Sequence, residues 1–474
     1  MNPIKRKTVP IREKRLNAIN AYLGPTAALL QEFQQGEIKQ RIRTFSQSVT
    51  DDVLTVLRLL SELEDIAVVI HSPRGCSASQ LYFDSFHENK NRWAITNLNE
   101  RDTIMGGDES LRQAIITLYQ RYHPKVIFVV TTPVVAINND DVFSVVEELR
   151  EEFGVLIIPI YTDGFKSKTG VSGYDAALHA LLKYLPLETS IQSNTDYFVN
   201  VLSLNENQQD VVEIVRLIHA LGLETNLLPG KTVLQNFAKA AQAQTSISLH
   251  NDYSEYLGRV LASQYNVPYL EALVPIGIKN THQWLVALGK SMGRENQAQL
   301  VARAHETEWL KEVLVSYQFS QVKVYVNLSA NLAWGLVGLV EELGAQVIGI
   351  TVHHVDQLHQ SLLADFNANN PSIPLHVADG QPFEQANILN RLQPDLYIGN
   401  AADTVWAAKQ GIAALSVDHL PLLGYRGAAF LAHELNKTIS NQTFVQNLHK
   451  NTSLPYRAQW YGKSPSWHIK MEVK

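Results

Sequence analysis

Short apolar runs alternate along the chain with segments whose apolar residues recur every three or four positions. In the first part, residues 66–70, 126–130 and 155–160 are compact runs rich in β-branched residues, which is typical of buried parallel strands. Between and after them, residues 141–152 and 174–184 have the period of an amphipathic helix. This alternation predicts a parallel α/β domain.

The same alternation returns in the middle of the chain. A strand is expected at 198–202, followed by an amphipathic helix at 208–221 that ends before Gly222. Further strands are expected near 246–249 and 269–273. A second α/β domain therefore begins close to residue 196.

The last part of the chain repeats the pattern most regularly. Strands are expected at 322–327, 347–352, 375–378, 396–399 and 413–417, and helices at 330–343, 384–392 and 403–409. Because strands joined by right-handed crossovers form sheets covered on both faces, we expect an α/β fold of three Rossmann-like, doubly wound parallel-sheet domains around a central cleft. The expected divisions are an N-terminal arm and helix (1–45), three domains (46–195, 196–315, 316–445) and a C-terminal extension (446–474).

Composition and charge restrict the function classes. The 474 residues are 45% hydrophobic, which is enough for several cores, and the net charge of -6 argues against general nucleic-acid binding. The basic run from Lys5 to Arg15 is either a solvated arm or an extension that wraps a partner subunit. One cysteine excludes an intrachain disulfide, and no apolar run reaches the roughly 18 residues of a membrane span. We expect a cytoplasmic protein that does not bind membranes.

The single cysteine is the main candidate for chemistry. Cys76 ends the segment His-Ser-Pro-Arg-Gly-Cys (71–76), which follows the strand at 66–70 and precedes a helix expected at 77–83. Ligands of α/β sheets bind at the carboxyl ends of strands, and a helix N-terminus there favours a thiolate, the form that binds metals. A lone cysteine is also often a small buried hydrophobic residue, and position alone leaves both interpretations open.

Other motifs are weak. No first strand is followed by the dinucleotide-binding glycine pattern, and Gly230-Lys231-Thr232 lacks the earlier glycine of a phosphate loop because that position is Thr225. His353, His354 and His359 follow a third-domain strand without a cysteine, so a polar surface loop is expected there rather than a metal site.

Five segments remain, in order along the chain, and together they resemble one family. They are 71–76, 105–115 (Met-Gly-Gly-Asp-Glu-Ser-Leu-Arg-Gln-Ala-Ile), 131–141 (Thr-Thr-Pro through Asp-Asp), 158–174 (Ile-Pro through Asp-Gly-Phe to Gly-Tyr), and 398–400 with 424–427 (Gly-Tyr-Arg-Gly). This series is similar to the nitrogenase component 1 superfamily, which comprises catalytic component 1 proteins, their cofactor-assembly scaffolds and the dark-operative protochlorophyllide reductases.

Departures from the family pattern indicate the type of subunit. Catalytic nitrogenase subunits contribute three cysteines each to a shared eight-iron cluster, whereas here the third position is Pro133 and the first falls near Asp51 and Asp52. An ordinary eight-iron cluster is therefore not expected.

A single cysteine in this motif resembles the β-type subunit of the cofactor scaffold, where the partner supplies three thiolates and this subunit the fourth to an interface 4Fe-4S cluster. Residues 275–284 also resemble a β-type segment. By similarity to protochlorophyllide reductases, Asp51 or Asp52 is an alternative ligand.

Two histidines lie where α-type subunits bind their iron cofactor. His250 falls at the position of the cofactor's cysteine ligand, and His419 lies near that of its histidine ligand. β-type chains carry no ligand at these positions. Contacts of His250 and His419 with a cofactor or substrate are therefore kept only as an alternative.

The resemblance implies a subunit of an oxidoreductase associated with nitrogen fixation, active only with its partner. It implies an α2β2 assembly with an α-type subunit, an ATP-dependent reductase that carries its own 4Fe-4S cluster and binds ATP itself, and a larger iron-sulfur cofactor elsewhere in the complex. Cys76 would be the metal ligand, His71 and Arg74 would lie near the cluster sulfurs, and Gly75 would allow close approach of the backbone. The alternatives are reduction of a substrate other than dinitrogen, such as a tetrapyrrole or a sulfur compound, and a structural partner subunit without a cluster. The substrate stays open.

Overall fold

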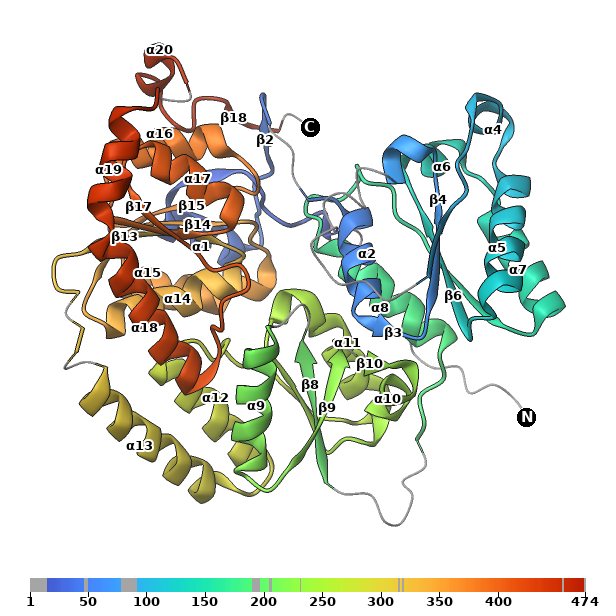
Figure 1. Ribbon diagram of the computed structural model, residues 1–474, viewed down its shortest axis with the longest axis horizontal. Helices are drawn as coiled ribbons and strands as arrows, with labels where there is room; N and C mark the ends of the chain where they lie inside the picture. Colours follow the sequence, from blue (N-terminus) through green and yellow to red (C-terminus); the bar gives the residue numbers. More distant parts are fainter. Residues whose placement is uncertain are drawn as a thin grey trace. The chain divides into compact units, whose positions relative to one another are not determined.

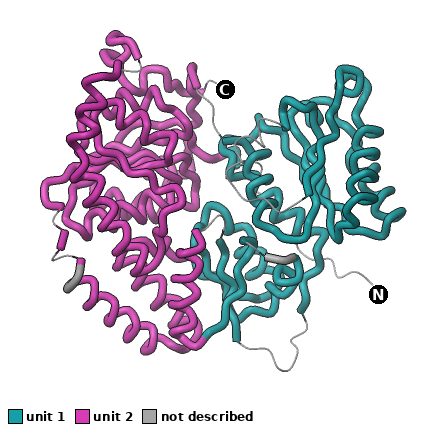
Figure 2. Tube along the Cα trace, in the orientation of Figure 1, with its two compact units in different colours: residues 1–16, 50–206, 223–271 teal, residues 17–49, 207–222, 272–474 magenta. Residues whose placement is uncertain are grey.

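The computed structural model describes residues 15–46, 50–77, 92–189, 197–203, 207–230, 232–313, 316–317, 319–453 and 456–472. These residues form two compact units (Figure 2). Unit 1 is built mainly from Thr50–Glu206 and Leu223–Glu271, and unit 2 from Asn17–Val49, Asn207–Gly222 and Ala272–Lys474. Each unit is described separately below.

Unit 1 contains a parallel sheet with the strand order β5-β4-β6-β7. Its two central strands, β4 and β6, are labelled in Figure 1. Its strands are β4 (Ala67–His71), β5 (Arg92–Ile95), β6 (Val126–Thr131) and β7 (Leu156–Ile160). The helices around it are α2 (Asp52–Ser61), α4 (Glu100–Met105), α5 (Asp108–Tyr122), α6 (Pro133–Asn138), α7 (Val142–Phe153) and α8 (Ser172–Tyr184).

Both faces of this sheet are buried, which explains the continuous apolar runs of its strands. Val68 and Val130 belong to the core that includes α2 and α8, whereas Val69 and Val129 belong to a separate core with α5 and α7. The alternation of side chains along each strand therefore supplies both layers from the same few residues.

A second parallel sheet, with the order β12-β11-β8-β9, also lies in unit 1. Its strands are β8 (Phe198–Ser203), β9 (Glu224–Pro229), β11 (Thr245–Ser248) and β12 (Tyr269–Leu270), and its helices include α10 (Leu234–Ala238), η2 (Lys239–Gln242) and α11 (Asn251–Tyr265). A short parallel pair, β3 (Leu63–Glu64) with β10 (Thr232–Val233), joins the two parts of unit 1. Strand β12 is shorter than the strand predicted at 269–273.

Unit 2 contains a six-stranded sheet with the order β1-β15-β14-β13-β16-β17. Its strands are β1 (Tyr22–Pro25), β13 (Lys323–Leu328), β14 (Gln346–Val352), β15 (Pro374–Val377), β16 (Leu396–Gly399) and β17 (Ala413–Ser416). All neighbouring pairs are parallel except β1 with β15. A separate antiparallel pair joins β2 (Arg41–Arg43) to β18 (Ile469–Met471).

The helices of unit 2 are α1 (Thr26–Gln35), α9 (Gln208–His219), α12 (Ile278–Ser291), α13 (Glu295–Glu312), α14 (Ala330–Glu342), η3 (Gln357–His359), α15 (Gln360–Asn369), α16 (Pro382–Leu392), α17 (Ala401–Lys409), α18 (Gly424–Ser440), α19 (Gln442–Lys450) and α20 (Ala458–Tyr461). Helices α14, α16 and α17 alternate with the strands as predicted, and the further helices complete the unit. None of the helices in the described part of the chain combines the length and the apolar character needed to cross a bilayer.

The three parallel sheets confirm the predicted α/β class with Rossmann-like sheets. One local expectation is wrong, because His354 and His359 are 0% and 2% exposed and so do not lie in a polar surface loop. For Arg15, the last residue of the basic run, the solvated alternative does not hold, since its side chain is buried in a bidentate ion pair with Asp175. The rest of that run, residues 1–14, lies outside the described residues.

Candidate functional site

Cys76 lies in a turn at the carboxyl end of β4. Residues 74–77 are helical, and Cys76 is partly exposed. The turn is fastened on both sides of the thiol, because the hydroxyl groups of Ser72 and Ser77 are hydrogen-bonded to each other and both bond to the carbonyl oxygen of Pro73. The geometry thus presents one anchored thiol to its surroundings.

The two residues before Cys76 are exposed. The Nε atom of Arg74 donates to Oδ1 of Asn97 at 3.1 Å. Among the described residues, no atom lies within 4 Å of a Cβ atom added to Gly75, so their packing does not require glycine at this position.

His71 lies inside the protein beneath the turn. Its side chain is fully buried, with Nδ1 3.1 Å from Oγ1 of Thr96 and Nε2 3.2 Å from Oδ2 of Asp140. The hydroxyl of Thr132 donates to the His71 carbonyl oxygen at 2.8 Å. Burial lowers the pKa of His71 to about 4, so the imidazole is neutral at neutral pH.

Asp140 connects His71 to the next motif. Its Oδ2 atom accepts a hydrogen bond from the Gly107 amide at 3.1 Å, and burial raises the pKa of its carboxyl group. A Cβ atom at Gly107 would lie 2.8 Å from Cε1 of His71 and 2.9 Å from the same carboxylate. Only glycine fits there. The first three motifs therefore meet around His71.

Pro133 and Asp51, which stand at or near the positions where catalytic nitrogenase subunits have cysteines, lie close together. Gly164 has a φ of +72°, and a Cβ atom on it would come within 2.8 Å of Cγ of Pro133 and 3.4 Å of Oδ2 of Asp51. Asp51 caps α2 by accepting from the Leu54 amide at 2.8 Å, and Asp52 accepts from the Gly164 amide at 2.8 Å. Both carboxylates thus have partners in the fold.

The motif glycine before Tyr174 has a packing role. A Cβ atom at Gly173 would lie 2.2 Å from both the Asp52 carbonyl oxygen and Oγ1 of Thr55, so α8 and α2 touch through this glycine. This contact holds the helix that carries Asp52 against the sheet.

The two histidines at the family's cofactor positions have different environments. His250 is the N-cap residue of α11, is 5% exposed, and its ring lies 5.5 Å from that of Tyr253. His419 is exposed, has a φ of 65°, and its carbonyl oxygen accepts from the side chain of Asn207. The two residues belong to different units.

Segments that leave the carboxyl ends of the first sheet carry exposed apolar side chains. We call the following residues the apolar rim: Ile104 and Met105 of α4, Ile137 of α6, Phe143 of α7 and Phe165. Their exposed fractions lie between 52% and 80%. Exposed apolar side chains gathered near one site are typical of an interaction surface.

In the sequence analysis, Asp140 belongs to a family motif but has no predicted role in the site, and Thr96 is not among the candidate residues. The Asp-Asp pair at 140–141 was the available signal for Asp140, whereas nothing in the sequence marks Thr96 as a partner of His71.

Comparisons with known proteins identify the family of this chain. Residues 52–440 match the family Nitrogenase component 1 type Oxidoreductase. The chain is similar to the nitrogenase iron-molybdenum cofactor biosynthesis protein NifE of Methanococcus maripaludis, with 24% identity over 78% of each chain. It is also similar to the nitrogenase molybdenum-iron protein alpha chain of Methanothermobacter thermautotrophicus, with 25% identity over 80% of this chain and 84% of that one.

A solved structure shares the fold. The structure titled "Nitrogenase Cp1 at pH 6.5" superimposes with a TM-score of 0.74 at 17% sequence identity, covering 88% of this chain and 98% of the other. Since the family match extends over most of the sequence, the chain belongs to the nitrogenase component 1 type oxidoreductase family.

Proposed function

We propose that this chain is the β-type subunit of a nitrogenase-like component 1 complex and supplies Cys76 as one ligand of a 4Fe-4S cluster shared with an α-type partner. The observation that carries the proposal is the placement of the chain's single thiol, partly exposed, in a fastened turn at the carboxyl end of β4. The assembly is α2β2, and its electrons come from an ATP-dependent iron-sulfur reductase that binds the ATP.

The site can supply one thiolate ligand to such a cluster, that of Cys76. A 4Fe-4S cluster takes four thiolates, and the positions at Pro133 and Asp51 offer none. Gly75 is exposed and meets none of the described residues, and the apolar rim offers a surface for the partner that supplies the other thiolates.

The remaining site residues hold the thiol in place. When bound, the cluster would supply one-electron transfer. Ser72 and Ser77 fix the turn, and the neutral His71, between Thr96 and Asp140, supports it from below. Arg74 and Gly75, the two exposed residues before Cys76, line the approach, and the Arg74 side chain is held by its hydrogen bond to Asn97.

The choice of a β-type subunit depends on the cysteine pattern, since one of the similar proteins is an alpha chain. The relative named for iron-molybdenum cofactor biosynthesis favours a scaffold role, in which a larger iron-sulfur cofactor is assembled in the complex. The alternative is a reductase that acts on a tetrapyrrole or a sulfur compound. The exposed His419 and the buried His250 then become candidate cofactor or substrate contacts.

The cluster proposal is tested by anaerobic co-expression with the α-type partner, followed by iron analysis and EPR of the dithionite-reduced complex. We expect Cys76→Ala to lose the interface cluster's iron and its EPR signal, while the matched control Gln113→Ala, an exposed residue of α5, keeps both. Unchanged iron in Cys76→Ala would overturn the proposal and support a structural subunit without a cluster.

Scaffold and reductase roles are then separated by what the loaded complex does. A scaffold transfers an iron-sulfur cofactor to a cofactor-free component 1 protein and restores its activity. A reductase converts a tetrapyrrole or sulfur substrate when the ATP-dependent reductase and ATP are supplied.

A further inference from the structure

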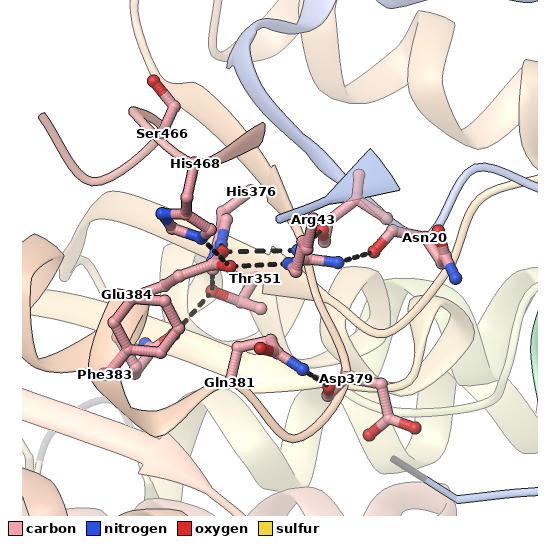
Figure 3. A network of polar contacts seen from close by, with 12 residues as sticks. Asn20, Arg43, Thr351, His376, Asp379, Gln381, Phe383, Glu384, Ser466 and His468 are labelled. Carbon is pink, nitrogen blue, oxygen red and sulfur yellow. Dashed lines mark hydrogen bonds and ion pairs between the residues drawn. The ribbon is translucent and has the colours of Figure 1, made fainter. Parts of the chain in front are cut away.

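Two segments far apart in sequence, residues 41–46 and 456–472, meet on the first turn of α16 in unit 2. Arg43 comes from β2 near the start of the chain, and His468 lies next to β18 near its end; both reach the carboxylate of Glu384 (Figure 3). A third donor, His376, comes from β15 of the six-stranded sheet. This arrangement is separate from the Cys76 site and independent of the function proposed for it.

Glu384 is fully buried and satisfied by these three donors. Its Oε1 atom accepts from Nε2 of His468 at 2.7 Å, and its Oε2 atom accepts from Nε2 of His376 at 2.6 Å. The guanidinium of Arg43 donates to both oxygens and also to the Val377 carbonyl oxygen. Burial alone would raise the pKa of Glu384, but the hydrogen bonds from the two histidines and Arg43 outweigh it, and the pKa is lowered. The carboxyl group is therefore ionised.

Two imidazoles and a carboxylate are also donors that a metal ion accepts. Here the permanently charged guanidinium of Arg43 contacts the Glu384 carboxylate, with its Nη2 atom 3.3 Å from Oε2. A metal cation would have to displace or repel this guanidinium. The cluster is therefore complete as a charge-balanced structural contact.

The neighbouring residue, Phe383, collects apolar groups from the same two chain ends. Its ring lies 5.0 Å from that of Phe45 and 4.7 Å from those of both Trp460 and His468. The indole of Trp460 also donates to the Phe383 carbonyl oxygen at 3.2 Å. The first turn of α16 thus offers one polar and one apolar attachment point, and each is used by both ends.

The ribbon formed by β2 and β18 needs this support. Each strand has three residues, and two further backbone bonds extend the pairing, from the Thr44 amide to the His468 carbonyl oxygen at 2.9 Å and from the Glu472 amide to the Gln40 carbonyl oxygen at 3.0 Å. A two-stranded ribbon of this length is not stable in water by itself. It is held where Arg43 and His468 converge on Glu384.

We propose that Phe383 and Glu384 form a latch that fastens residues 41–46 and 456–472, which we call the terminal strap, as one cooperative unit. The strap opens and closes as a whole while the six-stranded sheet stays folded. Loss of the attachment at one chain end therefore frees the other end, although the two are far apart in sequence.

Hydrogen exchange of the full chain, followed by mass spectrometry, tests the latch. In His468→Phe, which removes the donor but keeps an aromatic ring, we expect peptides from 456–472 and from 41–46 to exchange at least ten-fold faster. Arg43→Gln, altered at the other end, should give the same pair of changes. The matched control is Lys470→Gln, an exposed position of β18, which should leave both peptides unchanged.

Peptides from β13 report whether the sheet remains folded and should keep their protection in every variant. Faster exchange at 456–472 in His468→Phe with no change at 41–46 would overturn the proposal, because the two ends would then be attached independently. Loss of a bound metal ion in His468→Phe would also overturn it, since Glu384 would then be a metal ligand.

Discussion

Acidification should destabilise unit 1 through His71. The pKa of its side chain is about 4 in the folded protein, against an ordinary value of 6.5, because burial disfavours the charged imidazole. The unfolded chain therefore binds this proton more readily than the folded chain, and the free energy of unfolding falls as the pH drops below about 6.5 and stops falling below about 4. At about 1.4 kcal/mol per pH unit, the full effect is about 3 kcal/mol, of which about 2 kcal/mol is lost between pH 7 and pH 5.

The effect can be measured in unit 1 alone. Trp93 is the one tryptophan in the sequence of this unit, so fluorine NMR of 5-fluorotryptophan-labelled protein in urea reports its unfolding separately. Wild type should lose about 2 kcal/mol more than His71→Asn between pH 7 and pH 5, because asparagine does not titrate in that range. The matched control, His123→Asn, alters an exposed histidine at the end of α5 and should behave like wild type. Equal pH dependence in wild type and His71→Asn would refute the reasoning.

Three further predictions concern the same unit. Gly173→Ala should lower the free energy of unfolding by about 1–3 kcal/mol in urea titrations, because its Cβ atom would lie 2.2 Å from the Asp52 carbonyl oxygen; an unchanged midpoint would mean that the helices shift without cost. Asp51→Ala should cost about 1 kcal/mol by removing the cap on α2, whereas Asp51→Asn, which can still cap, should cost much less; equal losses would point to a role for the charge. Cys76→Ser in the isolated chain should change the free energy of unfolding by less than about 0.5 kcal/mol, since the side chain is partly exposed, and a large loss in thermal unfolding would show a buried structural thiol.

Much of the strand and helix pattern could be predicted because burial on both sheet faces leaves a strong signal. The run at 126–130 became β6 (Val126–Thr131), with Val129 and Val130 in different cores. Helix α14 (Ala330–Glu342) likewise followed from its apolar period and the glycine at 344.

Elements that depend on distant partners left no such signal. Strand β5 (Arg92–Ile95) is a half-exposed edge strand without a continuous apolar run. Strand β1 (Tyr22–Pro25) pairs antiparallel with β15, which is far away in sequence, so local pattern could not place it. The burial of His354 and His359 also depends on tertiary packing, which overrides the usual exposure of a histidine-rich loop.

The candidate site was predictable in its position but not in its internal contacts. The order of motifs placed Cys76 after β4, yet the contacts of His71 with Thr96 and Asp140 depend on how three strands end side by side. The latch at Glu384 was not predicted, because its donors come from three separate parts of the sequence.

The motif residues of unit 1 divide into buried supports and one partly exposed thiol, that of Cys76. Gly107, Gly173 and the His71–Asp140 pair pack or bond within the protein, and none of these contacts involves Cys76. The turn is thus held by hydrogen bonds that need no iron, in contrast to small domains whose folding depends on metal binding. It follows that Cys76→Ala, which removes the ligand in the proposed function, would leave the turn and the sheet next to it folded.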